Sequence, residues 1–326
     1  MNEYDGFNQN QKTRKGIIKP GPLAAMIIFI IVILSMIFVF SFAQYYLGMW
    51  GLIITEVGIL IIALLGMVAT GMSIKEMLPV KAIHLNEIFG VIIMWASTFM
   101  IVMVINLGIS LFTPEVFETG SELDTFFSGW PALASFLVLA VSPAICEEVL
   151  HRGFIQRCFC ARITNKFVIS FIVGLLFGIN HLDPIRLIGT GVLGGVMAYI
   201  LLETDNFLYN MFFHFLNNGI IHLISFGAGD VTQEVDIEAT MAMLPLGFAS
   251  YLIIGCVAPL IFVGGMFLLK GRKKLREWGK TKIIVSISVA FAVGFLMILG
   301  AVLIFSGLYL SGDLYEIISQ PMIFSK

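Results

Sequence analysis

Charged residues are scarce in this chain of 326 residues, because Asp, Glu, Lys and Arg together make up only 12% of it. A soluble globular protein has charged residues at about 25% of its positions. Hydrophobic residues reach 59% and the mean hydropathy is +0.98. The composition therefore excludes a soluble globule and predicts an all-α, polytopic membrane protein.

Paired cysteine spacing and an excess of positive charge are also missing. The four cysteines lack the paired loop spacing of a disulfide framework or a zinc knuckle, so we expect all of them to be reduced: Cys146, Cys158, Cys160 and Cys256. The first hydrophobic run is too long for a signal core and has no small-residue cleavage site, so no cleavable signal is expected. The net charge of -2 gives no indication of nucleic-acid binding.

Long hydrophobic runs are what the sequence has in abundance. A membrane-spanning helix needs roughly 20 apolar residues. Nine runs approach this length, which predicts about nine transmembrane helices near residues 22–46, 50–71, 88–112, 131–156, 166–182, 185–203, 206–226, 241–269 and 283–310.

The loop charges predict the orientation. Basic residues precede the first run at 12–19 and follow the eighth run at 270–282, so the positive-inside rule places both segments, and the N-terminus, in the cytoplasm. Alternation then puts the acidic loops 113–130 and 227–238 on the outer side of the cell membrane. Only Arg186 is a basic residue on that outer side.

The predicted organisation has four parts. A cytoplasmic tail covers 1–21, a transmembrane domain covers 22–269 with its motifs within 131–226, a basic cytoplasmic linker covers 270–282, and an additional helix and tail cover 283–326. The polar segment 72–87 is expected to be a cytoplasmic connector along the membrane surface. Two Gly-x-x-x-Gly pairs, Gly174 with Gly178 and Gly191 with Gly195, permit close helix packing.

Two carboxylates and an arginine interrupt the fourth run. Each ionised residue within a membrane helix costs roughly 2.5 to 3.5 kcal/mol on insertion scales, so such residues are usually paired or functional. Glu148 and Arg152 are four apart and share a helix face, which predicts an ion pair. Glu147 has no lysine or arginine at helical spacing and is free to face another group.

Histidines and asparagines of two later runs complete the candidate set. His181 ends the fifth run, and His214 and Asn218 are four residues apart in the seventh. Counting helix rise from the basic flanks places Glu147, His181 and His214 at depths of about 15, 22 and 12 Å, which predicts a shared intramembrane cavity. Each motif alone is as consistent with helix anchoring as with chemistry. We expect the following to be structural: His84, His151, His222, Glu56 and Phe177.

The ordered motifs Glu147-Glu148-x-x-x-Arg152, Phe177-x-x-x-His181 and His214-x-x-x-Asn218 resemble the CPBP family, the CAAX-protease and bacteriocin-processing proteins. This family includes the eukaryotic Ras-converting CAAX endopeptidase. The resemblance implies an intramembrane endopeptidase with a cavity open to the cytosol. Its partners would be the lipid bilayer and membrane-associated peptides, either prenylated or bacteriocin-like. The ninth helix and the basic linker depart from the family pattern.

The resemblance is compatible with two mechanisms. In the first, Glu147 is a general base, His181 helps to activate the water, and His214 and Asn218 stabilise the oxyanion, while Glu148 and Arg152 brace the helix. In the second, Glu147, His181 and His214 bind a catalytic zinc ion. The metal-free mechanism explains Asn218 better.

Two other classes stay open on the residues alone. A proton-coupled transporter would be expected to show an inverted repeat or discontinuous helices, and neither is visible. A non-catalytic immunity or scaffold protein would have no need of the four reactive residues.

Overall fold

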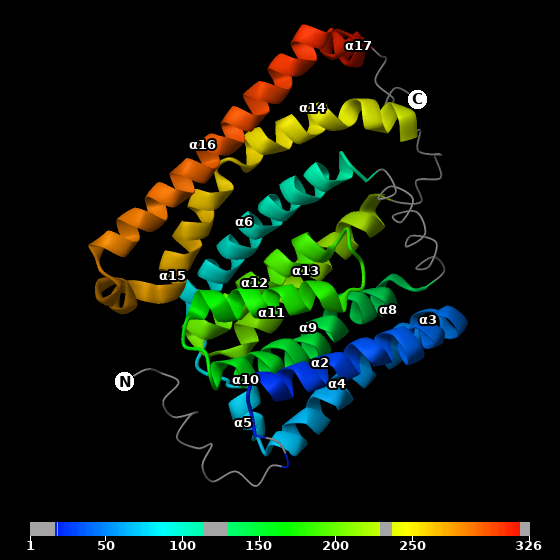
Figure 1. The fold of residues 1–326 in the computed structure, drawn as a ribbon, viewed down its shortest axis with the longest axis vertical. Coiled ribbons are helices and arrows are strands. Elements are labelled where there is room, and N and C mark those ends of the chain that lie inside the picture. Colours follow the sequence, from blue (N-terminus) through cyan, green and yellow to red (C-terminus); the bar gives the residue numbers. More distant parts are fainter. Residues whose placement is uncertain (1–16, 18, 114–129, 229–236, 320–326) are drawn as a thin grey trace.

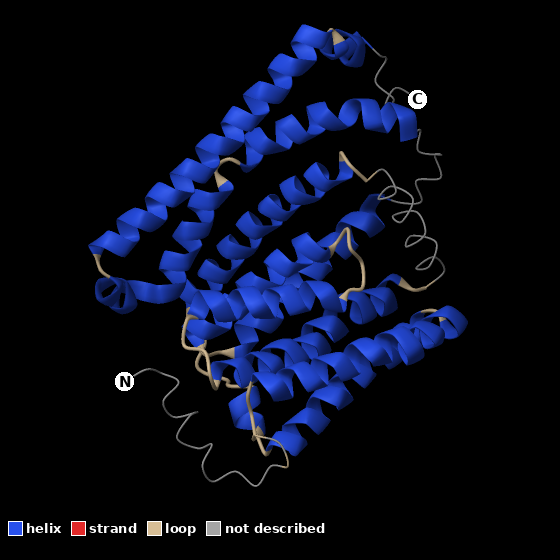
Figure 2. Ribbon diagram, in the orientation of Figure 1, coloured by secondary structure: helices blue, strands red, loops and turns tan. Residues whose placement is uncertain are grey.

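The computed structural model describes residues 17, 19–113, 130–228 and 237–319, and every regular element in these ranges is a helix (Figures 1 and 2). The predicted all-α membrane architecture is confirmed. The predicted outer loops 113–130 and 227–238 fall almost entirely outside the described residues.

Seven helical stretches of the described chain are long and apolar enough to cross a membrane: Pro22–Leu47, Met49–Thr70, Leu85–Ser110, Ala132–Cys160, Leu187–Thr204, Thr240–Arg272 and Lys280–Ser311. The other two predicted spans also form helices. The first, α11 (Lys166–Asn180), has only 15 residues. The second, α13 (Phe207–Ala228), has 22 residues but is interrupted by asparagines and histidines. α11 is apolar but too short to meet the criterion for a span, and α13 is long but too polar. These two helices bring the second and third motifs.

Several spans are built from more than one element. The first consists of α2 (Pro22–Ser35), the π-helical turn η2 (Met36–Phe40) and α3 (Ser41–Leu47). The fourth consists of α8 (Ala132–Phe136), η3 (Leu137–Val141), α9 (Ser142–Glu148), η4 (Val149–Ile155) and α10 (Gln156–Cys160). The remaining helices of the first half are α4 (Met49–Thr70), α5 (Ile74–Met77) and α6 (Leu85–Ser110).

Helices α11 and α12 (Leu187–Thr204) pack backbone to backbone along their glycines. A Cβ atom added to Gly174 would lie 2.6 Å from the Gly191 carbonyl oxygen and 2.7 Å from the Gly195 nitrogen. One added to Gly178 would lie 2.4 Å from the Leu187 carbonyl oxygen. The two Gly-x-x-x-Gly pairs therefore face each other, and no larger residue fits between these helices.

The C-terminal helices form a layer on one side of the bundle (Figure 1). α16 (Lys280–Ser311) packs on α14 (Ile237–Gly255) and α15 (Ala258–Trp278), and both of these pack on α6. The last described helix is α17 (Asp313–Ser319). The additional ninth span thus contacts the bundle through α14 and α15.

The eighth span and the basic segment after it differ from the expectation. The predicted single run 241–269 is broken between α14 and α15 at Cys256 and Val257, where a Cβ atom on Gly294 of α16 would lie 2.4 Å from the Cys256 carbonyl oxygen. The basic segment 270–282 is mostly helical, because α15 runs to Trp278 through a kink at Gly271 with φ 64° and α16 starts at Lys280.

Basic side chains from two elements, α11 and α15, converge on the C-terminal end of α12. Glu203 pairs with Lys270 at 2.7 Å and with Lys166 at 3.5 Å, and Lys274 Nζ donates to the Glu203 carbonyl oxygen at 2.5 Å. Cations are favourable at a helix C-terminus because the unpaired carbonyls carry partial negative charge. The basic residues that flank α11 and α15 therefore lie at one end of the bundle, as the alternation of loop charges predicted.

Asp205 joins two further basic residues at the same end. Its carboxylate is 2.8 Å from Arg157 Nη2 and 2.9 Å from Lys81 Nζ. Burial raises the pKa of this carboxyl, but the two cations outweigh burial and leave the pKa below its ordinary value. Because the folded-state pKa is lowered, these contacts stabilise the fold near neutral pH, and their contribution is lost as the pH falls through the folded-state pKa.

The buried pair of Glu203 and Lys270 yields a stability prediction. Both side chains are 6% exposed, so Glu203→Gln leaves the Lys270 ammonium buried beside a neutral partner. Removing one member of a buried ion pair costs about 3 kcal/mol. We expect Tm in detergent to fall for Glu203→Gln and to recover partly in Glu203→Gln/Lys270→Met. An unchanged Tm in the single variant would contradict the stabilising role of the pair.

Candidate active site

The hydrogen-bond register of the fourth span changes on either side of α9, and α9 contains Pro143 in its first turn. Pro143 has no N–H group to donate to the carbonyl of Leu139, four residues earlier. That carbonyl oxygen accepts a hydrogen bond from Asn218 Nδ2 of α13 at 3.2 Å instead. The proline thus connects the fourth span to α13 through a side chain of the third motif.

The predicted ion pair of the fourth span is present at the centre of the bundle. Arg152 Nη1 donates to Glu148 Oε1 at 2.7 Å, and both side chains are fully buried. The same Oε1 atom is 2.9 Å from His214 Nδ1 of α13. Arg152 Nη2 also donates to the Gly194 carbonyl oxygen of α12 at 2.9 Å. The carboxylate oxygen therefore links the fourth span to α13, and Arg152 extends the network to α12.

Three histidines have the orientation of their rings fixed by their Nδ1 atoms. His181 Nδ1 is 2.8 Å from the Phe177 carbonyl oxygen, and His151 Nδ1 is 3.0 Å from the Glu147 carbonyl oxygen. A carbonyl oxygen only accepts, so both Nδ1 atoms carry the hydrogen and both Nε2 atoms have the lone pair of a base. The carboxylate of Glu148 likewise assigns the Nδ1 hydrogen of His214.

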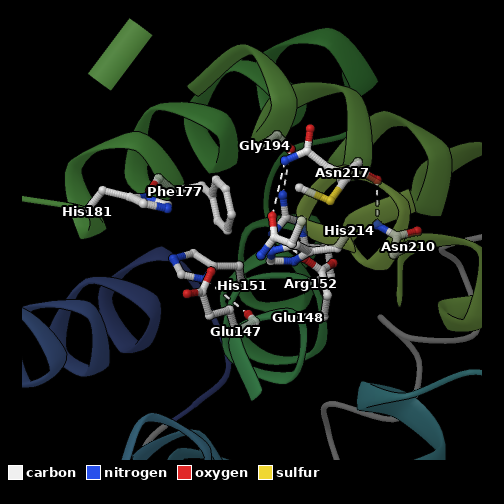
Figure 3. A network of polar contacts seen from close by, with 12 residues as sticks. Glu147, Glu148, His151, Arg152, Phe177, His181, Gly194, Asn210, His214 and Asn217 are labelled. Carbon is white, nitrogen blue, oxygen red and sulfur yellow. Dashed lines mark hydrogen bonds and ion pairs between the residues drawn. The ribbon is translucent and has the colours of Figure 1, made fainter. Parts of the chain in front are cut away.

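Phe177 lies between two groups of polar side chains. Its ring centroid is 5.0 Å from those of His151 and His181, and 5.7 Å from that of His214. The Arg152 guanidinium lies 4.4 Å from the same centroid, a cation–π contact. Figure 3 shows Glu147, His151 and His181 on one side of Phe177, and Glu148, Arg152 and His214 on the other.

Glu147 is half-buried, and its neighbours include His181 and a second carboxylate. Electrostatic interactions connect it to His181 of α11 and to Glu56 of α4. Glu56 is 4% exposed and therefore lies inside the bundle. The sequence places Glu147 and Glu56 on different helices, so their proximity was not visible from spacing.

Four of the thirteen buried polar atoms without a hydrogen-bond partner among the described residues lie within six residues of the fourth span. They are Glu147 Oε2, Glu148 Oε2, His151 Nε2 and Arg152 Nε, and the other nine are spread over the rest of the described chain. Buried polar groups in native proteins are nearly always paired, because each unpaired one costs free energy. Four such atoms within six residues are typical of a site built for chemistry rather than for stability.

Asn218 does not join His214 in the way its spacing predicted. Its Nδ2 donates to the Leu139 carbonyl oxygen, and its Oδ1 accepts from Asn217 Nδ2 at 3.1 Å. One of its two amide hydrogens is therefore committed to the fourth span. The structure brings Glu147, Glu148, Arg152, His181 and His214 around Phe177, with Asn218 one turn beyond His214.

Three residues outside the predicted set belong to this arrangement. His151 is fully buried in it, and its position four after Glu147 was the available signal. Phe177 contributes its ring. Gly194 leaves room for Phe177, since a Cβ atom at Gly194 would lie 2.7 Å from Phe177 Cβ. Nothing in the sequence around Gly194 indicates this contact.

The residues predicted as zinc ligands do not converge on one point. In the part of the chain that the structure describes, no group of three His, Cys, Asp or Glu side chains is arranged to hold a metal ion. His214 is turned to Glu148, whereas His181 lies beside Glu147 across Phe177 (Figure 3). Glu147, His181 and His214 therefore do not fit a common metal centre in this arrangement.

Comparisons with known proteins identify the segment that contains these motifs. Residues 129–220 match the family described as Rce1-like, the type II CAAX prenyl endopeptidase Rce1-like proteins. No curated protein and no solved structure matches the chain. The matched segment runs from the start of the fourth span to the third motif, and it contains every residue of the polar cluster except Glu56. The ordered motifs and this match thus make residues 129–220 similar to the type II CAAX prenyl endopeptidases.

Proposed function

We propose that this protein is an intramembrane endopeptidase that hydrolyses peptide bonds of membrane-associated substrates with a glutamate-activated water. The observation that carries the proposal is the meeting of motifs from three spans around Phe177, with bases on one side of the residue and a buried charge network on the other. The match of residues 129–220 to the type II CAAX prenyl endopeptidases supports the same reaction class.

Water activation is assigned to Glu147 and His181. Glu147 has a carboxylate oxygen without a partner among the described residues, and His181 presents the lone pair of Nε2 because Nδ1 donates to Phe177. A water held by both groups would pass a proton to Glu147 as it attacks the scissile carbonyl. The protonated carboxyl would then supply that proton to the leaving amine.

Oxyanion stabilisation is assigned to His214, and Glu148 makes this role feasible. Nδ1 of His214 faces Glu148, so Nε2 donates a hydrogen bond only when the ring is an imidazolium. The Glu148 carboxylate is the counter-ion that stabilises this imidazolium, and Arg152 holds the carboxylate in place at 2.7 Å. Glu148 would therefore act through His214 as well as bracing the helix. The second amide hydrogen of Asn218 is the further donor in this proposal.

Metal-free chemistry is preferred because Glu147, His181 and His214 do not fit a common metal centre in the described arrangement. The transporter and immunity alternatives explain less. An immunity or scaffold protein does not require histidine Nε2 lone pairs and an unpaired carboxylate oxygen to face one region, and the sequence shows no inverted repeat of the kind expected for a transporter.

Substrate access is assigned to the cytosolic side. Basic residues of four segments collect at one end of the bundle, around Glu203 and Asp205, and positive flanks are cytoplasmic in most membrane proteins. The N-terminus would then be cytoplasmic. A short peptide delivered to the bilayer by a prenyl group, or by an apolar leader of bacteriocin type, suits a site at this depth.

The assignment of roles predicts the effects of single substitutions. Glu147→Gln and His181→Ala should lower kcat by about 10² to 10⁴, the usual contribution of acid–base groups. His214→Ala should lower it by about 10² to 10³, the cost of an oxyanion donor. Cleavage of a panel of lipidated and leader peptides by purified protein in liposomes measures this. His222→Ala is the matched control on α13 and should retain full activity; equal loss in the control would refute the assignment.

The metal-free mechanism predicts resistance to chelators. Prolonged treatment of the purified protein with a strong zinc chelator should leave the cleavage rate unchanged, and elemental analysis of active protein should find no stoichiometric zinc. Activity that disappears with the chelator and returns with added zinc would establish the alternative mechanism.

Membrane presentation predicts a preference between matched peptides. A lipidated peptide should be cleaved faster than the same sequence without the lipid, because the lipid concentrates it at the bilayer where the site lies. Rates in liposomes measure the ratio. Equal rates for the two peptides would show that the site does not select for membrane anchoring.

A further inference from the structure

His151 is a fully buried histidine for which the proposed mechanism has no use. It lies in η4, one turn after Glu147, and its Nε2 has no hydrogen-bond partner among the described residues. An apolar ring would fill this space without leaving a buried nitrogen unpaired, which costs free energy. Stability alone therefore does not account for an imidazole here.

One edge of the imidazole holds the backbone of the proposed base. His151 Nδ1 donates to the Glu147 carbonyl oxygen at 3.0 Å. Glu147 lies at the end of α9, and η4 begins two residues later at Val149. At such a junction the hydrogen-bond spacing changes from four residues to five, so the amide that serves each carbonyl changes as well. A side-chain donor at this carbonyl fixes the turn from which the Glu147 carboxylate projects.

The ring of His151 also contacts Phe177, the residue that orients His181. Its centroid is 5.0 Å from that of Phe177 in a T-shaped contact. The carbonyl oxygen of Phe177 accepts the Nδ1 hydrogen of His181. His151 therefore touches both supports of the water-activating pair: the main chain of Glu147, and the residue that sets the tautomer of His181.

We propose that His151 is a positioning residue for peptide hydrolysis, which holds the Glu147 turn through its Nδ1 hydrogen and the Phe177 ring through its own ring, so that Glu147 and His181 address the same water. This inference rests on the endopeptidase function proposed above. The charged and titratable groups that face His151 are Arg152 on its own element, His181 from α11 and His214 from α13.

Two substitutions separate the hydrogen bond from the packing. His151→Phe keeps an aromatic ring against Phe177 but removes the donor. His151→Asn loses the ring but places an amide N–H where Nδ1 was. If the Nδ1 hydrogen positions Glu147, the Phe variant should lose roughly 10²-fold in kcat with KM unchanged, as expected for a small misplacement of a catalytic group. The Asn variant should keep kcat within about tenfold of wild type.

An exchange measurement tests the same contact without a substrate. Hydrogen–deuterium exchange of peptides covering residues 142–156 should be faster in His151→Phe than in wild type, and close to wild type in His151→Asn. The full-length proteins should be compared in the same liposomes. If His151→Phe does not fold, His151→Gln replaces it, because its amide occupies the Nε2 position and does not reach the Glu147 carbonyl.

The outcomes distinguish this inference from the proposed function. Wild-type activity in a folded His151→Phe variant, with Glu147→Gln inactive, would overturn the role of His151 and leave the endopeptidase intact. Equal loss in the Asn and Phe variants would also overturn it, since the donor would then not matter. If no peptide of the panel is cleaved by wild type, the proposed function fails, and unchanged exchange at 142–156 would then reject the contact as well.

Discussion

The arrangement of the bundle depends on one buried oxygen atom, Oε1 of Glu148, which is within 2.9 Å of donors from Arg152 and His214. A carboxylate without compensating donors is excluded from such an interior, because losing its hydration costs several kcal/mol. The charge is tolerated only while η4 and α13 keep their donors in place. Arg152 in turn extends the network to α12 through the Gly194 carbonyl oxygen. The relative positions of three spans are thus fixed by the requirement to satisfy one charge.

The arrangement of the site also depends on the close approach of α11 and α12. The facing glycines let the two backbones meet, and the absence of a side chain at Gly194 leaves room for Phe177 against α12. The ring of Phe177 then contacts the Arg152 guanidinium, and its carbonyl oxygen accepts a hydrogen bond from His181 Nδ1. An aromatic ring here gives cation–π attraction to the guanidinium without competing for the carboxylate. The glycines of α11 and α12 therefore create the space that Phe177 occupies.

The sequence alone determined the class, the spans and the ion pair. Long apolar runs have one solution in a bilayer, a helix that satisfies its own backbone, so the all-α fold followed from composition and run length. Helical spacing fixed the pair of Glu148 and Arg152, because residues four apart share a face whatever the rest of the chain does. The ordered motifs carried the family resemblance. The nine helices predicted from these runs all have counterparts in the described chain, of which seven are long and apolar enough to span a membrane, α11 is apolar but short, and α13 is long but more polar.

Only the tertiary structure decided which neighbours the polar groups have. His214 faces Glu148 and not Glu147, His151 lies inside the site, Glu56 approaches Glu147 from α4, and Asn218 serves the carbonyl that Pro143 leaves free. None of these contacts is set by spacing within one helix. They depend on the rotation of each helix about its axis and on the π-turns that shift the register of the fourth span. Those are properties of packing between segments distant in the chain, which a linear pattern does not contain.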